Sequence, residues 1–249
     1  MVPVSHGCHV IGHRVIKGGS DLDSDSDSDS VVVQREQMEN AELWYFGIFD
    51  SLIGDGVTKY MQSHFFQKQL KESHVSKKCK ETLKKAYLNA RAKMREQEKS
   101  DERCSNRMSS ASVIVVNGEK LVMANMGNYR AVVCRDGIAY DKNGRHQQSA
   151  KRHYWTRRLF SVRILACDSG AATRHSKSSE LVVAAERIDS DTEFLILASH
   201  GIWEVMKNQE AVNLIRHIED PQEAAECLAK EALIRMSRSN ISCIIIRFD

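Results

Sequence analysis

Two apolar runs separated by a short turn constrain the fold of this chain most strongly. Residues 111–116 and 119–125 are rich in Val, Ile, Leu and Met, and Asn117-Gly118 stands between them. Asn-Gly suits a two-residue type I′ turn, because both central positions of that turn need a positive φ. The sequence therefore predicts an antiparallel hairpin in this region.

Further strands and helices follow one another in blocks along the chain. A second hairpin is predicted from 130–135, Asp136-Gly137 and 138–140. β-Branched and aromatic content predicts strands at 31–33, 43–49, 181–185, 194–198 and 241–248. Periodic apolar residues and capping signals predict helices at 57–70, 76–99, 208–217 (capped by Asn208) and 221–236 (capped by Asp220). Strands and helices in blocks favour an α+β layered fold over a doubly wound sheet.

Composition narrows the class of protein without naming a function. The chain has 249 residues, 42% hydrophobic and 28% charged, which is typical of a soluble globular protein. A net charge of +3 gives no argument for nucleic acid or a membrane surface as partner. No apolar run approaches the ~20 residues that span a bilayer, and no signal peptide is recognised. The seven scattered cysteines suggest reduced thiols, so we expect a cytoplasmic or nuclear protein.

Two segments depart from ordinary globular composition. An alternating Ser/Asp repeat within residues 21–30 cannot bury apolar surface and is expected to form a solvated loop. Its serines lie between acidic residues and are candidate phosphorylation sites: Ser24, Ser26 and Ser28. Residues 141–179 are basic with an aromatic patch, which we interpret as a degenerate loop, because no RNA-binding motif accompanies it.

Asp50 and His200 stand out because each follows an apolar run. Asp50 ends the run from Leu43 to Phe49, and His200 follows the run from Phe194 to Ala198. Both are therefore expected to present a polar side chain at the end of a buried strand. If both strands end at one site, that site holds a carboxylate and an imidazole.

Several segments resemble the metal-dependent protein phosphatase 2C family, in particular its short plant members. The Phe-Asp-Gly-His-Gly-Gly element of the family is similar to Phe49–Gly54. Its Ala-Asn-Val-Gly-Asp-Ser-Arg segment is similar to Ala124–Arg130, and its Leu-Ala-Ser-Asp-Gly-Leu-Trp-Asp-Val element to Leu197–Val205. The start of its Gly-Ser-Thr-Ala strand resembles Met108–Ala111, and its closing Ser-Asp-Asn-Ile-Thr strand resembles Arg238–Ser242.

The resemblance implies a single domain over residues 1–249. Its fold would be a four-layer α-β-β-α arrangement, a central antiparallel β-sandwich flanked by helices. In that family, two Mg²⁺ or Mn²⁺ ions at one end of the sandwich activate a water that attacks a phosphoserine or phosphothreonine. Hard divalent ions of this kind take oxygen ligands, mostly carboxylates.

Matched positions then indicate which metal ligands remain in this chain. The remnants are Asp50, Asp29 (within the Ser/Asp repeat) and the backbone carbonyl of Ser51. Positions where a family aspartate is replaced are His200, Ser239 and Asn128. Losing carboxylates from such a pair of ions lowers the rate on the order of a thousandfold or more. No catalytic residue is assigned, and Mg²⁺ or Mn²⁺ binding is expected to be weak or absent.

The resulting hypothesis is a catalytically impaired pseudophosphatase, which regulates a phosphoprotein or a kinase by binding it. The protein is expected to be a monomer. The alternative is a residual Mg²⁺/Mn²⁺-dependent serine/threonine phosphatase, with one ion held through Asp50 and water. Two other metal sites stay open: a transition-metal site of Asp29, Asp50 and His200, and a zinc site around His6, Cys8 and His9. A further alternative makes the fold a passive carrier that is regulated by phosphorylation of the acidic loop.

Overall fold

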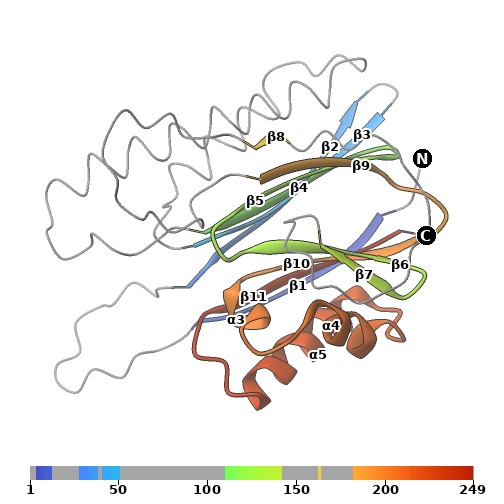
Figure 1. Ribbon diagram of the computed structural model, residues 1–249. Helices are drawn as coiled ribbons and strands as arrows, with labels where there is room; N and C mark the ends of the chain where they lie inside the picture. Colours follow the sequence, from blue (N-terminus) through green and yellow to red (C-terminus); the bar gives the residue numbers. More distant parts are fainter. Residues whose placement is uncertain are drawn as a thin grey trace, which may run out of the picture.

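Two antiparallel β-sheets face each other, and the helices α3, α4 and α5 cover the outer face of one of them (Figure 1). The structure, a computed structural model, describes residues 4–12, 28–38, 41–50, 110–141, 162–163 and 182–248. Within them, the predicted α+β sandwich is confirmed. The predicted helices 57–70 and 76–99, and most of the segments 21–30 and 141–179, lie outside the described residues.

The helix-covered sheet has the strand order β1-β11-β10-β6-β7. Its strands are β1 (Val4–Ile11), β11 (Ile241–Phe248), β10 (Thr192–Ala198), β6 (Arg130–Arg135) and β7 (Ile138–Asp141). The strand β11 lies between β1 and β10 and is buried on both faces over residues 241–246, which explains its continuous apolar sequence.

The second sheet has the strand order β2-β3-β4-β5-β9-β8. Its strands are β2 (Ser30–Met38), β3 (Ala41–Phe49), β4 (Ala111–Asn117), β5 (Lys120–Met126), β9 (Val182–Arg187) and β8 (Val162–Arg163). The register pairs Ser30 with Phe49, Phe49 with Ala111, and Ala111 with Met126, so these strand ends lie side by side at one end of the sandwich.

Among the described residues, two apolar cores hold the layers together. One fills the space between the sheets and includes Phe46, Ile48, Leu195 and Ile244. The other lies between the helix-covered sheet and its helices. Strand side chains alternate in direction, so β10 sends Leu195 to the first core and Phe194 to the second.

Both predicted hairpins form, but the first turn lies one residue further along than predicted. Asn117 pairs with Lys120, so the central turn residues are Gly118 and Glu119. Gly118 has φ +54° and Glu119 has no positive φ, which fits a type II′ turn with Gly at its first central position. In the second hairpin Asp136 and Gly137 both have positive φ, and the predicted type I′ turn is confirmed.

The helices of the described residues are α3 (His200–Trp203), α4 (Asn208–Ile215) and α5 (Pro221–Ile234). Asp220 accepts hydrogen bonds from the backbone of Gln222 and Glu223, so the predicted cap of α5 is confirmed. The predicted cap of α4 is wrong. Lys207 is the residue before the helix, and its backbone N–H donates to the Glu210 carboxylate at 2.8 Å, which leaves Asn208 as the first helical residue.

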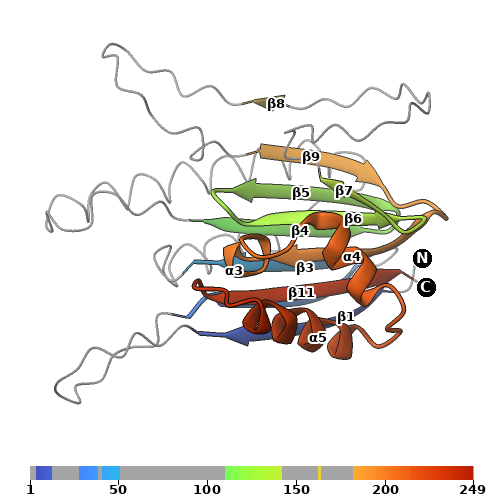
Figure 2. The same ribbon diagram turned by 60° about the horizontal axis from the view of Figure 1, so that its bottom comes forward.

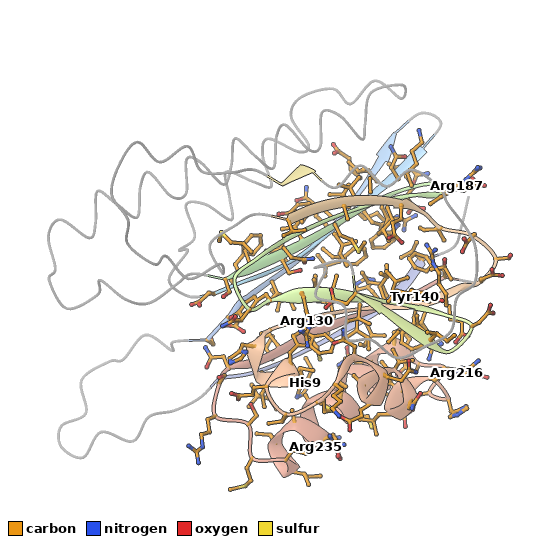
Figure 3. All side chains as sticks on the ribbon, viewed as in Figure 1. His9, Arg130, Tyr140, Arg187, Arg216 and Arg235 are labelled. Carbon is orange, nitrogen blue, oxygen red and sulfur yellow. The ribbon has the colours of Figure 1, made fainter. Side chains whose placement is uncertain are left out.

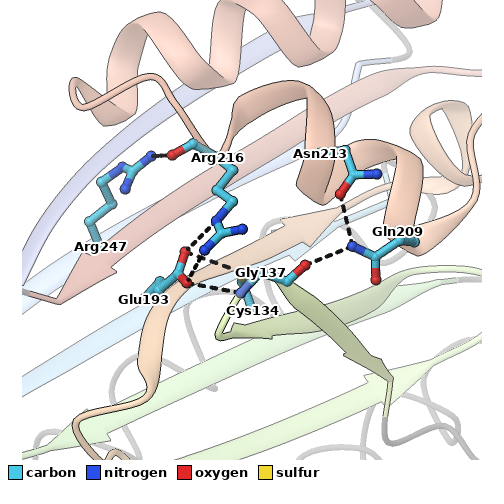
Figure 4. Close-up of polar contacts among 7 residues, drawn as sticks. All are labelled: Cys134, Gly137, Glu193, Gln209, Asn213, Arg216 and Arg247. Carbon is cyan, nitrogen blue, oxygen red and sulfur yellow. Dashed lines mark hydrogen bonds and ion pairs between the residues drawn. The ribbon is translucent and has the colours of Figure 1, made fainter. Parts of the chain in front are cut away.

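Polar contacts dock the β6–β7 hairpin onto α4 (Figure 4). Gln209 donates to the carbonyl oxygen of Gly137 at 2.7 Å and accepts from the backbone N–H of Ala139 at 2.9 Å. Glu193 accepts from Arg216 and from the Gly137 backbone. These bonds anchor the edge strand β7 to the helical layer.

The helix α5 lies along β1 and β11, as Figure 2 shows. The face it turns to the sheet carries small or apolar residues: Ala224, Ala225, Leu228, Ala229 and Ala232. At its start, Gln222 accepts a hydrogen bond from the Cys8 backbone at 3.0 Å. Gly7 is buried at this point, and a Cβ there would overlap the backbone of Pro221 and Gln222.

Among the described residues, no helix is long and apolar enough to cross a membrane. That the whole of residues 1–249 forms one domain stays a prediction.

Replacing Gly7 with Ala is expected to destabilise the protein by about 3 kcal/mol, because backbone cannot move aside as a flexible side chain can. Gly118→Ala is the matched control. Its φ of +54° is unfavourable for Ala, but nothing lies within 4 Å of the added methyl, so we expect about 1 kcal/mol. Urea unfolding of both variants measures the difference, and equal losses would contradict the close contact of α5 with β1.

Candidate functional site

Strand ends of both sheets meet at one end of the sandwich and carry most of the predicted site residues. The second sheet contributes Asp29, just before β2, and Asp50, just after β3. The helix-covered sheet contributes His200 after β10 and Ser239 before β11. The turn from β5 to β6, which crosses between the sheets, contributes Asn128. The predicted positions therefore converge, although they are spread over more than two hundred residues of sequence.

Asp29 links the two sheets through its carboxylate. The side chain is only 5% exposed. Its Oδ1 accepts from the Tyr129 hydroxyl at 2.6 Å, and its Oδ2 accepts from the Ser242 hydroxyl at 2.7 Å. Asn240 adds a longer contact to Oδ1 at 3.4 Å. Hydrogen bonds to a carboxylate are worth about 1.5–3 kcal/mol each, so these neutral donors offset much of the cost of burying the charge.

Tyr129 is a site residue that the sequence reasoning missed. Its ring packs in the core between the sheets and is 5% exposed, while its hydroxyl reaches Asp29. Burial, the charge of Asp29, the hydrogen bond and the charge of Asp50 all raise the pKa of the Tyr129 hydroxyl far above its usual value. The resembling family segment has Ser where this chain has Tyr129, a difference that marks the position but does not reveal its contact with Asp29.

Asp50 is half-buried and lies at the same end of the sandwich as Asp29. Its backbone N–H donates to the carbonyl oxygen of Ser110 at 3.0 Å, which fixes the end of β3 against the start of β4. Because Ser30 pairs with Phe49, Asp50 follows β3 beside the position where Asp29 precedes β2. Asp29 and Asp50 are thus brought together. Ser51, whose carbonyl was the third predicted remnant, lies outside the described residues.

The turn that carries Asn128 is held by Ser110. Gly127 has φ +69°, and a Cβ there would overlap the Ser110 side chain. The Asn128 backbone N–H donates to the Ser110 hydroxyl at 3.1 Å. Because Gly127 has no side chain, the turn can lie close to Ser110, and this contact positions both Asn128 and Tyr129.

His200 and Ser239 are both organised by Glu204. One Glu204 carboxylate oxygen lies 3.6 Å from His200 Nε2, whose side chain is 43% exposed. The other accepts from the Ser237 hydroxyl at 2.7 Å and from the backbone N–H groups of Arg238 and Ser239 at 2.8 and 3.0 Å. Burial raises the pKa of Glu204, but these hydrogen bonds and His200 outweigh it, so the pKa is lowered overall.

The ends of β10 and β11 are tied together beneath this loop. The Ser199 hydroxyl donates to the carbonyl oxygen of Asn240 at 2.8 Å and accepts from the backbone N–H of Ser242 at 2.9 Å. The Trp203 indole donates to the carbonyl oxygen of Ala198 at 3.0 Å, and the Arg130 guanidinium lies over its ring (Figure 3 shows Arg130 beside α3). These contacts fix the position of His200 relative to Ser239.

The oxygen ligands in this part of the chain do not fit a pair of hard divalent ions. Both carboxylate oxygens of Asp29 already accept short hydrogen bonds from Tyr129 and Ser242. Among the described residues, no group of three or more His, Cys, Asp or Glu side chains is arranged to hold a metal ion. Mg²⁺ and Mn²⁺ prefer several carboxylate oxygens, and Asp29 and Asp50 supply the ones brought together here.

The zinc alternative also meets a geometric obstacle. His6 and Cys8 lie on one face of β1, where His6 packs edge-on against Trp44 and Phe46. The side chain of His9 points to the opposite face of β1, because side chains alternate along a strand. It lies on the side of the helices (Figure 3).

Of the serines predicted as phosphorylation sites, Ser28 is described and is half-buried before Asp29, whereas Ser24 and Ser26 lie outside the described residues.

Solved structures with the same fold are protein phosphatases. A bacterial serine phosphatase matches with a TM-score of 0.66 and 15% identity, covering 99% of this chain and 98% of its own. PppA of Pseudomonas aeruginosa matches with a TM-score of 0.61 and 13% identity over 99% and 98%. The catalytic domain of the serine threonine protein phosphatase PstP, in complex with 2 manganese ions, matches with a TM-score of 0.59 and 11% identity over 100% and 99%. At these identities the match shows the fold alone.

Sequence comparison shows the family. The Protein phosphatase 2C profile matches residues 23–159 and 176–241. "Putative protein phosphatase 2C-like protein 44" of Arabidopsis thaliana is 47% identical, over 100% of this chain and 87% of that protein. "Probable protein phosphatase 2C 39" of the same plant is 32% identical over 99% and 86%. The chain therefore belongs to the protein phosphatase 2C family, a family of metal-dependent serine/threonine phosphatases, and the resemblance to plant members is confirmed.

Replacing Glu204 with Gln is expected to lower stability at pH 7 by about 1–2 kcal/mol, because neutral amide oxygen is a weaker acceptor for the bonds that hold the loop. The lowered pKa of Glu204 means that its contribution is complete above the ordinary Glu value of about 4.3 and is lost as pH falls through the folded-state value.

The gap between wild type and Glu204→Gln should therefore close as pH falls below about 4. Urea unfolding across pH measures it. Glu231→Gln, which removes one pair with Arg235 on an exposed helical surface, is the control and is expected to cost under about 0.5 kcal/mol. A gap that stays constant down to acid pH would contradict the role of the Glu204 charge.

Proposed function

We propose that this chain is a pseudophosphatase: a protein phosphatase 2C domain with little or no hydrolytic activity that regulates another protein by binding it. The observation that carries the proposal is the bonding of Asp29. Its two oxygens are held by the hydroxyls of Tyr129 and Ser242, at the position where the family resemblance assigns a metal ligand.

The electrostatics of the remaining site support the same conclusion. Two positions assigned to metal-binding aspartates carry His200 and Ser239, so the charge that would balance two divalent ions is roughly halved. The backbone N–H of Ser239 and the imidazole of His200 are both directed to Glu204. Imidazole is a poorer partner than carboxylate for Mg²⁺. We therefore propose that Mg²⁺ and Mn²⁺ bind weakly or not at all.

The regulatory role rests on the fold. A sandwich that keeps the family's architecture but lacks its chemistry can still present the surface with which the family meets phosphorylated proteins, so we propose a phosphoprotein or a kinase as partner. The described cysteines, Cys8, Cys134, Cys227 and Cys243, are all free thiols, which supports action in a reducing compartment, cytoplasm or nucleus.

Phosphothreonine-peptide hydrolysis with Mn²⁺ tests the enzymatic part of the proposal. The wild type is expected to turn over on the order of a thousandfold more slowly than a revertant that combines Tyr129→Ser, His200→Asp and Ser239→Asp. Adding Asp50→Asn to that revertant should abolish its activity and serves as the control that the regained turnover comes from this site.

Wild-type turnover at the level of the revertant, abolished by EDTA, would contradict the pseudophosphatase and favour a residual metal-dependent phosphatase. For the regulatory part, the tagged wild type should recover a specific phosphoprotein or kinase from cell extract. Recovery of no specific partner would count against that part alone.

A further inference from the structure

We propose that Tyr129 is a built-in substitute for a metal ion. Its hydroxyl fills the place beside Asp29 where a cation would otherwise balance the charge, and the fold no longer needs a divalent ion there. This role of Tyr129 rests on the proposed weak metal binding and does not depend on any binding partner.

The contacts of Asp29 provide the first argument. A buried carboxylate needs either a cation or several hydrogen bonds, because an unpaired charge in the protein interior costs several kcal/mol. Here it has short bonds from Tyr129 and Ser242, at 2.6 and 2.7 Å. Distances of this length are typical of a hydroxyl donating to an ionised carboxylate.

The position of the hydroxyl provides the second argument. It lies against Asp29, which precedes β2 at the same end of the second sheet where Asp50 follows β3. A cation bound to Asp29 would have to compete with this hydroxyl for Oδ1 and with Ser242 for Oδ2.

The packing of the ring provides the third argument. Tyr129 is 5% exposed and belongs to the core between the sheets, together with Phe46, Ile48 and Leu197. The preceding Gly127, with φ +69° against Ser110, fixes the start of the turn. The hydroxyl is thus held in place from both the ring and the backbone, and does not swing freely out of the site.

Titration of the full chain with Mn²⁺ tests the proposal. Binding is measured as the loss of the electron paramagnetic resonance signal of the free ion. Tyr129→Ser restores the residue of the resembling family segment and makes room between the carboxylates. We expect it to bind Mn²⁺ about tenfold or more tightly than the wild type. Tyr129→Phe removes the hydroxyl but keeps the ring in place, so we expect a smaller gain than for Tyr129→Ser. Adding Asp29→Asn to Tyr129→Ser should remove the gain.

A wild type that binds Mn²⁺ as tightly as Tyr129→Ser would overturn the proposal, as would a folded Tyr129→Ser variant without any gain. Since the serine variant leaves a large cavity and can fail to fold, thermal unfolding of the wild type gives a second test. We expect its Tm to be the same with Mn²⁺ and with EDTA. A Tm that rises by several degrees with Mn²⁺ would overturn the proposal whether or not the serine variant folds.

The outcomes also separate this inference from the proposed function. A wild type that binds Mn²⁺ tightly but hydrolyses no phosphopeptide would refute the role of Tyr129 and the proposed weak metal binding, and would leave the proposed lack of hydrolytic activity standing.

Discussion

The buried carboxylate of Asp29 is the constraint around which this end of the molecule is built. It precedes β2 in the second sheet, and its hydrogen bonds reach Tyr129, in the turn between the sheets, and Ser242, in the helix-covered sheet. A carboxylate that is only 5% exposed has to be balanced locally, because the interior solvates charge poorly. The groups that balance the charge of Asp29 also determine what this site can bind. Here the hydroxyls of Tyr129 and Ser242 donate to the two carboxylate oxygens of Asp29.

Neighbouring contacts make this arrangement rigid. Ser199 ties the end of β10 to the start of β11, and Ser110 holds the turn that presents Asn128 and Tyr129. Glu204 accepts hydrogen bonds from the loop before β11, including one from the backbone N–H of Ser239. Among the described residues, these hydrogen bonds connect the strand ends of both sheets, and two hydroxyl donors converge on the carboxylate of Asp29.

Much of the fold could be predicted from the sequence because local signals and tertiary structure agree. The Asp136-Gly137 turn, the cap of α5 by Asp220 and the interior position of β11 follow from backbone geometry and apolar continuity. The errors arose where two local solutions lie one residue apart. Gly118 fits the first position of a type II′ turn as well as the second position of a type I′ turn. Asn208 is a good capping residue, yet the capping bond is made by Glu210 with the backbone of Lys207.

The candidate site was predictable only in part. Asp29, Asp50 and His200 could be proposed because a motif or an apolar run leads to each, and the structure brings their strand ends together. Tyr129 could not be found by searching for chemically active residues, since a tyrosine between strands usually belongs to the core. Its role depends on a contact with Asp29 across 100 positions of sequence, which no local pattern encodes. The register of the Ser/Asp repeat was likewise undetermined until the pairing of Ser30 with Phe49 fixed Asp29 at the strand end.

A crystal structure of the wild type grown in Mn²⁺, with anomalous diffraction data at the manganese edge, tests the central claim most directly. The account predicts the Tyr129 hydroxyl within hydrogen-bond distance of Asp29 and no anomalous peak between Asp29 and Asp50. An anomalous peak that bridges those two carboxylates, with Tyr129 displaced from Asp29, would contradict it.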